Sequence, residues 1–292
     1  MARKKENAPK IGLALSGGAA RGLAHIGVLR ALLEHKIPID FIAGTSAGAI
    51  VGGTMASGMP LDEIESIGRN LRWRDVGRMT MSRMGVQSNE RLEQYLRSRL
   101  PVTRFEGLPI PFAAVATDLH SGKAVVMRTE GDLPSAIRAS CAIPGWYVPV
   151  TDVQGRQLVD GGLVANIPSG VARSLGADIV IAVDVNAEGA TFLGPSRSLI
   201  SIMLQAMLLV QRTASFYQLE GADFVISPRV GHIRWDELAR AEELITAGYD
   251  AALESIPSIK TRLEEDSQPA PRWYQIRRRK IISNKPPVSL PR

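Results

Sequence analysis

One serine, Ser46, lies among small residues in the stretch FIAGTSAGAIVGG, from Phe41 to Gly53. The apolar run before it predicts a strand and the residues after it predict a helix, so Ser46 falls in a tight strand-to-helix turn. Such a turn exposes the serine hydroxyl and aims helix N–H groups at it, as in a nucleophile elbow. A side chain at Gly44 or Gly48 would collide with the backbone or block the hydroxyl, which accounts for the small neighbours. The alternative is that Ser46 only caps the helix.

A second glycine turn, LSGGAARG from Leu15 to Gly22, has the same strand–turn–helix pattern. The N–H groups of Gly17, Gly18 and Ala19 would be free at the start of its helix and would form an anion cradle. This cradle fits either a phosphate or the oxyanion of an acyl-transfer intermediate. The sequence contains no Walker A motif, no G-x-G-x-x-G match and no Tyr-x-x-x-Lys pair of a short-chain dehydrogenase. Because Ser46 should end a neighbouring strand, we favour the oxyanion hole.

A carboxylate in a similar setting follows in LVDGGLVANIP, where Asp160 precedes two glycines, the first of them Gly161. It is either a base on a tight turn or an ordinary turn-forming aspartate. Of the histidines, His25, His35 and His120 precede Asp160, and only His232 follows it. His232 alone therefore satisfies the Ser…Asp…His order of α/β-hydrolases, although no motif surrounds it.

Strand and helix patterns alternate along the chain and indicate a mostly parallel sheet covered on both faces. Strands are predicted at 10–16, 39–45, 111–119, 124–129, 177–185 and 222–228, the third and fourth as a hairpin. Helices are predicted at 20–35, 47–58, 132–143, where Pro144 should stop the helix, 168–176 and 237–256.

The patterns of two segments allow more than one interpretation. Residues 69–87 are aperiodic and rich in Met and Arg, and we expect an irregular surface loop rather than a mobile cap over a site. Residues 199–210 are apolar but too short to span a membrane. We expect a buried helix there; the alternatives are that it lines an acyl pocket or lies on a membrane.

Composition indicates a globular protein of a reducing compartment, with 292 residues, a net charge of +6 and the single cysteine Cys141. Cys141 should be a small buried residue. Without a signal-peptide pattern, we expect a cytoplasmic location. The cations gather near both ends, in Arg3–Lys5 and Arg272–Lys280. The second cluster suits peripheral contact with an anionic membrane, whereas no nucleic-acid-binding module is present.

The motifs SGGAARGLAHIGVL, GTSAGAIVG and LVDGGLVANIP, in this order, closely resemble those of the bacterial patatin-like phospholipases. The block IRASCAIPGWYVP, between Ser46 and Asp160, also resembles that family. The resemblance extends from about Lys10 to Asp184, and more loosely to Glu264. On this basis we expect a basic extension over residues 1–9, a patatin-like catalytic domain over 10–264 and a basic tail over 265–292.

The resemblance implies a three-layer α/β/α sandwich that hydrolyses acyl esters of lipids, phospholipid or lysophospholipid, without histidine, metal or cofactor. It makes Ser46 the nucleophile, Asp160 the base, and Gly17 and Gly18 the main oxyanion donors. Many members carry a third glycine where this chain has Ala19. If the turn requires a positive φ at this position, alanine raises its conformational energy by about 1 kcal/mol relative to glycine. Arg21 beside the hole either holds the turn or favours an anionic substrate, and Asn166 can orient the loop after Asp160. The alternative function is a catalytically silent lipid-binding or regulatory protein of the same fold.

Overall fold

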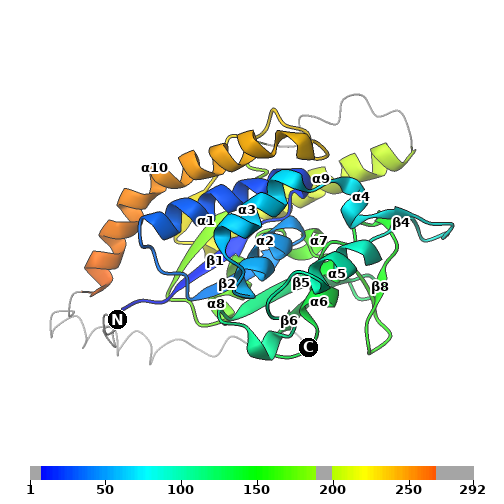
Figure 1. Cartoon of the computed structure of the whole chain (residues 1–292), viewed down its shortest axis with the longest axis horizontal. Coiled ribbons are helices and arrows are strands. Elements are labelled where there is room, and N and C mark those ends of the chain that lie inside the picture. Colours follow the sequence, from blue (N-terminus) through cyan, green and yellow to red (C-terminus); the bar gives the residue numbers. More distant parts are fainter. Residues whose placement is uncertain (1–7, 189–198, 268–292) are drawn as a thin grey trace.

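Figure 1 shows the computed structural model of the chain, which describes residues 8–188 and 199–267. The basic cluster Arg3–Lys5 and the tail cluster Arg272–Lys280 lie outside the described residues. Helix α10 extends to Ser267, the last described residue, three residues beyond the boundary predicted at 264.

The centre of the molecule is an eight-stranded sheet in the order β11–β10–β1–β2–β5–β9–β8, with β6 paired to β5. The pairs from β11 to β5 are parallel, whereas β6 and β9 run antiparallel to β5, and β8 antiparallel to β9. The mostly parallel sheet and the hairpin of the third and fourth predicted strands are therefore confirmed. The strands are β1 (Ile11–Leu15), β2 (Phe41–Thr45), β5 (Phe112–Asp118), β6 (Ala124–Arg128), β8 (Val150–Thr151), β9 (Gln157–Asp160), β10 (Ile179–Val183) and β11 (Phe224–Ile226).

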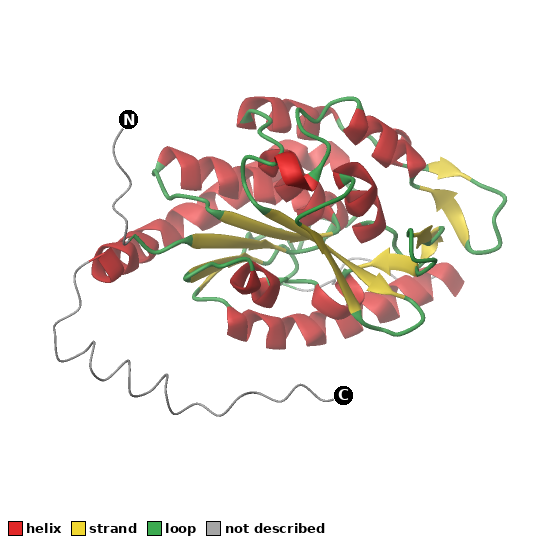
Figure 2. Cartoon of the chain, turned by 90° about the horizontal axis from the view of Figure 1, so that it is seen from below, coloured by secondary structure: helices red, strands yellow, loops and turns green. Residues whose placement is uncertain are grey.

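Helices cover both faces of this sheet, as Figure 2 shows with the sheet seen nearly edge-on. The helices are α1 (Ala24–Glu34), α2 (Ala47–Ala56), α3 (Leu61–Asn70), α4 (Trp73–Val76), α5 (Glu90–Arg97), α6 (Leu133–Ser140), α7 (Gly162–Ala165), α8 (Ser169–Ser174), α9 (Leu199–Gln218) and α10 (Ala241–Ser267). A short 3-10 helix, η1 (Ala19–Leu23), precedes α1. The predicted three-layer α/β/α sandwich is confirmed.

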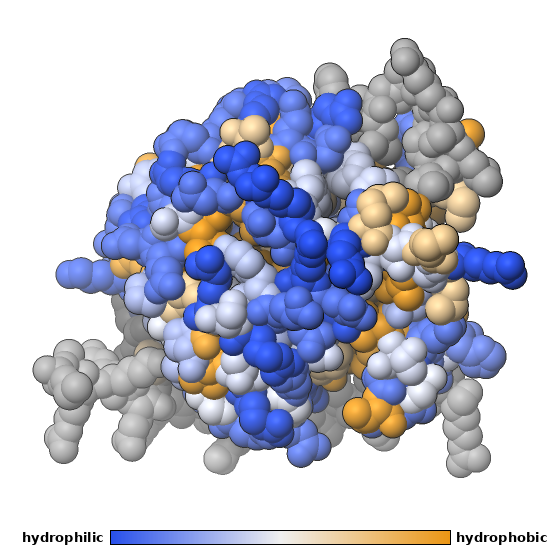
Figure 3. All heavy atoms as spheres, turned by 45° about the vertical axis from the view of Figure 1, so that its right-hand side comes forward, coloured by the Kyte–Doolittle hydropathy of each residue, from blue (hydrophilic) through white to orange (hydrophobic). Residues whose placement is uncertain are grey.

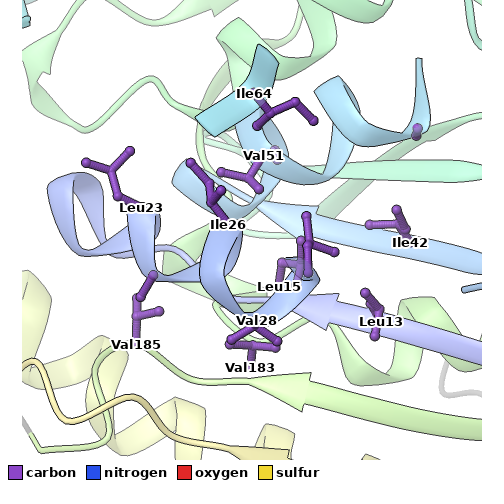
Figure 4. Close-up of a cluster of buried hydrophobic side chains, with 14 of the residues drawn as sticks. Leu13, Leu15, Leu23, Ile26, Val28, Ile42, Val51, Ile64, Val183 and Val185 are labelled. Atoms are coloured by element: carbon purple, nitrogen blue, oxygen red, sulfur yellow. The ribbon is translucent and has the colours of Figure 1, made fainter. Parts of the chain in front are cut away.

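The two faces of the sheet are packed differently because side chains alternate along each strand. Leu13, Leu15 and Ile42 point to the face that carries the larger hydrophobic cluster with α1 and α2 (Figure 4). Full burial of such a side chain contributes about 2 kcal/mol to folding. The opposite face carries small residues such as Ala14 and Ala43, which let α8 pack close to the strands.

Three predicted elements differ from the structure. Residues 69–87 are not an irregular loop: they contain α4 and strand β3 (Arg78–Met79), and strand β4 (Gly85–Ser88) begins within them. These strands form a second sheet with β7 (Gly145–Tyr147), so their pairing depends on residues distant in sequence. Helix α6 ends at Ser140 rather than near Pro144, and α10 is longer than predicted. Among the described residues, no helix is long and apolar enough to cross a membrane.

Candidate active site

Strand register brings Ser46 and Asp160 to the same level of the sheet. In the parallel pair of β2 and β5, Thr45 lies opposite Val115. In the antiparallel pair of β5 and β9, Asp160 lies opposite Ala116. Because Ser46 directly follows Thr45, the serine and the aspartate stand on either side of β5 at matching heights.

The serine corner, residues 44–48 between β2 and α2, is a sharp turn. Ser46 has φ 52° and ψ −121°, and its side chain makes no capping hydrogen bond to α2. The simple N-cap interpretation is therefore wrong. A Cβ atom at Gly44 would overlap the main chain of Gly48, and one at Gly48 would overlap the Leu15 carbonyl oxygen. The predicted collisions are confirmed, and only glycine fits at positions 44 and 48.

A buried hydroxyl holds the backbone of this corner. The Ser46 N–H donates to Ser140 Oγ at 2.9 Å, and the Ser140 hydroxyl donates to the Val115 carbonyl at 2.6 Å. Ser140 lies at the end of α6 and is fully buried. It thereby ties the unusual conformation of Ser46 to the central strand β5.

Ser46 and Asp160 interact through their side chains in a buried setting. A side-chain hydrogen bond joins them, and the Gly162 N–H donates to Asp160 Oδ1 at 2.8 Å. The exposed fractions are 7% for Ser46 and 4% for Asp160. Burial raises the pKa of Asp160 to about 6, while the two hydrogen bonds act in the opposite direction. At neutral pH this carboxylate is still mostly ionised, and it is a stronger base than a free aspartate with a pKa near 3.9.

The main chain around Asp160 is also fixed. Its N–H donates to the Ala142 carbonyl at 2.9 Å, and its carbonyl accepts from the Thr117 hydroxyl at 2.9 Å. A Cβ at Gly161 would overlap the Val115 carbonyl oxygen, so the chain can turn this closely against β5 only with glycine there. The aspartate is therefore more than a turn former: its position is set by three neighbouring segments.

The other titratable side chains do not supply a base to Ser46. None of the histidines lines the cavity in front of Ser46. His232 is exposed and lies 2.7 Å from Glu243, while His25 is buried against the Ser16 carbonyl, and its burial lowers its pKa to about 4. The Cys141 thiol is buried beside Ser46, and burial raises its pKa well above the usual value, so it remains protonated.

The glycine corner, residues 16–19 between β1 and η1, faces the serine corner. A Cβ placed on Gly17 would lie 3.1 Å from the Ser46 Cβ. The Gly17 N–H donates to the Asn166 carbonyl at 3.2 Å, and the Gly17 carbonyl accepts from Asn186 Nδ2 at 2.8 Å. Both polar groups of Gly17 are therefore already bonded, which the sequence did not predict.

The next two N–H groups have a different status. Within the described part of the chain, neither the Gly18 N–H nor the Ala19 N–H donates to a protein acceptor. Ala19 has φ 50°, so the conformation at this position is the left-handed one that favours glycine. Gly18 packs so closely on Val185 that a Cβ atom would overlap that side chain.

Two polar side chains fix the surroundings of the glycine corner. Asn166 is buried; its Oδ1 accepts from Gln211 Nε2 at 2.6 Å, and its Nδ2 donates to Ser215 Oγ at 3.1 Å. It thereby links α9 to the Gly17 main chain. Arg21 is also buried and donates from Nε to the Ile233 carbonyl at 2.7 Å. Of the two roles considered for Arg21, the contacts support holding the turn.

A cavity of about 550 Å³ opens in front of both corners. Its lining includes the side chains of Ser46 and Asp160 and the turn residues Gly17, Gly18 and Ala19. Much of the remaining wall is apolar, with Ile143, Trp146, Met207, Leu208, Phe216 and Trp235. Among residues 8–188 and 199–267, no group of His, Cys, Asp or Glu side chains is arranged to hold a metal ion.

Helix α9 supplies one wall of the cavity, and the predicted buried helix at 199–210 is wrong in this respect. Met207 and Leu208 line the cavity, whereas Val210 has an exposed fraction of 66%. The sequence patterns also did not identify Ser140, Asn186 or Trp235 as residues of the site. Ser140 lies within the block IRASCAIPGWYVP, but nothing in that block indicates its contact with Ser46, and no local motif marks Asn186 or Trp235. The contacts of all three arise only when distant segments pack together.

The model of the patatin-like phospholipase family matches residues 13–173, more than half of the chain, and this range includes Ser46 and Asp160. The chain belongs to the patatin-like phospholipase family. The predicted family is therefore confirmed.

Relatives of this patatin-like chain are found in bacteria and in animals. An uncharacterized NTE family protein of Mycobacterium bovis is 42% identical over 194 residues, which cover 65% of this chain and 52% of that protein. Patatin-like phospholipase domain-containing protein 7 of Rattus norvegicus is 36% identical over 62% of this chain and 14% of its own length. The matched region thus spans about half or less of these relatives.

A fungal relative and a solved structure extend the comparison. Lysophospholipase NTE1 of Mycosarcoma maydis is 37% identical over 60% of this chain and 10% of its own length. The crystal structure of VipD from Legionella pneumophila superposes with a TM-score of 0.60, covering 86% of this chain and 67% of VipD. Their sequence identity is 14%, so the likeness to VipD concerns the fold alone.

Proposed function

We propose that this patatin-like chain hydrolyses acyl esters of lipids through an acyl-enzyme on Ser46. The observation that carries the proposal is the interaction between the side chains of Ser46 and Asp160, which are both buried and both line a largely apolar cavity. An ionised carboxylate beside a hydroxyl accounts for the activation of the nucleophile. Free main-chain N–H groups at the facing corner account for a site that receives the developing negative charge.

In the first half of the reaction, Ser46 Oγ attacks the ester carbonyl carbon while Asp160 accepts the hydroxyl proton. The carbonyl oxygen becomes the oxyanion of a tetrahedral intermediate. When the intermediate collapses, the C–O bond to the alcohol breaks, and Asp160 returns the proton to the leaving alkoxide. The acyl group is then an ester of Ser46.

In the second half, water replaces the alcohol. Asp160 accepts a proton from the water as its oxygen attacks the acyl carbon, and collapse of the new intermediate releases the fatty acid. The proton passes back to Ser46 Oγ, which restores the starting state. Because burial raises the pKa of Asp160 to about 6, the carboxylate is ionised at neutral pH and still has enough proton affinity to act in both halves.

The oxyanion donors that we propose are the N–H groups of Gly18 and Ala19. The Gly17 N–H, predicted from the sequence as a main donor, is bonded to the Asn166 carbonyl, so we place Gly17 in a supporting role. The loss of one such donor typically lowers kcat by about 10²- to 10³-fold.

The lining supports a lipid ester as substrate. Trp146, Met207 and Leu208 offer an apolar wall to an acyl chain, and the cavity volume of about 550 Å³ lies in the usual range for ligand sites. Arg212, exposed at the same cavity, is suited to a phosphate-bearing head group. Phospholipid or lysophospholipid is therefore the substrate class that we propose.

The test compares wild type with Ser46→Ala, Asp160→Asn and His232→Ala on a fluorogenic short-chain ester. We expect each of the first two variants to lose at least about 10³-fold in kcat. We expect His232→Ala to match wild type, because His232 lies outside the cavity. A fluorophosphonate probe should label wild type at Ser46 and leave Ser46→Ala unlabelled.

Two results would contradict this proposal. Loss of activity in His232→Ala with retention in Asp160→Asn would favour a triad. Folded wild type that neither hydrolyses esters nor reacts with the probe, yet binds lipid, would favour a catalytically silent lipid-binding protein.

A further inference from the structure

Helix α9 has its polar and apolar sides reversed relative to an ordinary surface helix. Its inward side carries Gln211 and Ser215, both buried and hydrogen-bonded to Asn166. Among the side chains of α9 that the structure describes, those on its outward side include large exposed aliphatic, thioether and aromatic groups, which we call the α9 outer face: Ile202, Met203, Leu209, Val210, Phe216 and Tyr217. A surface helix normally turns such residues toward the core. The arrangement indicates that the outer face meets an apolar environment.

The charged residues of α9 indicate which kind of apolar environment its outer face meets. The helix contains no aspartate or glutamate, and its one charged residue is Arg212, which is exposed. Exposed apolar residues also occur in the turn between β3 and β4, where Met81 stands beside the exposed cation Arg83. Neither α9 nor this turn contains an acidic residue, and apolar side chains next to cations suit the boundary between acyl chains and anionic head groups.

The outer face is continuous with the mouth of the cavity. Leu209 and Phe216 belong to the outer face and also line the cavity. Helix α9 and β4 lie toward the same end of the molecule, and Figure 3, which turns this end forward, shows apolar atoms gathered on its right-hand part. A partner protein seated on Leu209 and Phe216 would cover the entrance, whereas a bilayer there would supply the substrate.

We propose that the α9 outer face docks on a phospholipid bilayer and orients the cavity mouth toward it, an inference that rests on the proposed lipid hydrolysis. Met203 and Val210 insert their side chains among the acyl chains, and Arg212 lies at the level of the head groups. A lipid can then enter the cavity along Leu209 and Phe216 without crossing water. The docking surface is thus part of the folded domain and separate from the basic tail.

The test measures binding to vesicles of phosphatidylcholine with about 20% phosphatidylglycerol by flotation, in a Ser46→Ala background so that the lipid stays intact. The variants are Met203→Glu, Val210→Glu and the double variant; neither residue lines the cavity. We expect each single variant to partition at least about tenfold less and the double variant about 100-fold less. Leu33→Glu, at an exposed residue of α1, is the matched control and should bind like its parent.

The same substitutions, made in the active protein, separate docking from chemistry. Hydrolysis of vesicle phospholipid should fall in parallel with binding, while hydrolysis of a soluble short-chain ester stays at the wild-type rate. Unchanged vesicle binding in the double variant would overturn the proposal. So would a change from dimer to monomer in the double variant with unchanged vesicle binding, which would assign the face to a second copy. Absence of ester hydrolysis in wild type would instead count against the proposed function, since flotation of the Ser46→Ala protein does not depend on it.

Discussion

The corners that follow β1 and β2 both place a non-glycine residue at positive φ, Ala19 at 50° and Ser46 at 52°. They lie side by side because β1 and β2 are neighbours, with Leu15 opposite Gly44. At the serine corner, the proposed role requires a side chain, so the strained conformation cannot be relieved by glycine. At the glycine corner, the proposed role belongs to main-chain N–H groups, and the methyl group of Ala19 is not needed.

The two corners are also held by different means. The serine corner is held by two buried hydroxyls: Ser140 Oγ accepts from the Ser46 N–H, and Thr45 Oγ1 donates to the Ala165 carbonyl at 2.7 Å. At the glycine corner, the distant side chain of Asn186 donates to the Gly17 carbonyl, and Arg21, in the 3-10 helix that follows, donates to the distant Ile233 carbonyl. The serine corner presents one side chain, the glycine corner presents backbone donors, and different contacts hold the two corners in place. The following predictions examine this difference.

The largest effect on stability is expected beside the serine corner, where Asp160 is buried. Its pKa of about 6 lies above the unfolded value near 3.9, so the native state binds more protons than the unfolded state between these values. The free energy of unfolding therefore falls as pH rises through this window, by about 3 kcal/mol in total. Asp160→Asn removes this titration and should be about 2 to 3 kcal/mol more stable than wild type above pH 7.

Urea unfolding of both proteins across pH 3.5 to 8 provides the measurement. The two stabilities should converge below about pH 4, where Asp160 is protonated in both states. A difference that is independent of pH would show that ionisation of Asp160 does not oppose folding.

The second prediction concerns the support of the serine corner. Ser140→Ala leaves the buried Ser46 N–H without its acceptor and should lower the free energy of unfolding by about 2 kcal/mol. The matched control is Ser169→Ala, because Ser169 is equally buried and its hydroxyl has no partner among the described residues. The control should be neutral or stabilise by up to about 1 kcal/mol. Equal losses in the two variants would mean that Ser140 contributes only packing.

The smallest effect is expected at the glycine corner. Ala19→Gly should raise the free energy of unfolding by about 1 kcal/mol, because glycine adopts positive φ without steric cost. Ester hydrolysis should stay within about threefold of wild type, because glycine keeps the N–H group that the proposed mechanism uses and the Ala19 side chain has no role in it. At the serine corner, Ser46→Gly should exceed Ser46→Ala in stability by a similar amount, with both inactive. A loss of stability in Ala19→Gly would show that the positive φ of Ala19 does not strain the folded protein.

The parts of the site that the sequence predicted are those built from local turn chemistry. Gly44, Ser46 and Gly48 identify a sharp corner by their own sizes, and the structure confirms why those sizes are needed. The mostly parallel sheet could also be predicted from the sequence, because continuous apolar strands alternate with helical patterns. The proposed roles of Ser46 and Asp160 remain predictions, although the geometry brings the two side chains together.

The parts that the sequence did not predict depend on packing between distant segments. The helical pattern of α9 fixes its periodicity but not which side faces the protein, and that side is chosen by the hydrogen bonds of Gln211 and Ser215 with Asn166. Strand β4 pairs with the nearby β3 and also with β7, about 60 positions away, and this second pairing is beyond the reach of local patterns. The engagement of the Gly17 N–H by Asn166 likewise has no local signal.

The hydrogen bond from Asn186 to the Gly17 carbonyl affects which substitutions can disturb the Gly18 N–H, one of the proposed oxyanion donors. A trans peptide group is planar, so its C=O and the following N–H point in opposite directions, and the Asn186 side chain that holds this carbonyl also sets the direction of the Gly18 N–H. Proline is the one standard residue whose substitution at position 18 would delete this main-chain hydrogen; every other side chain leaves it in place. A change elsewhere in the chain can also misdirect this donor: a variant of Asn186 can impair turnover while every residue of the sequence motifs stays intact.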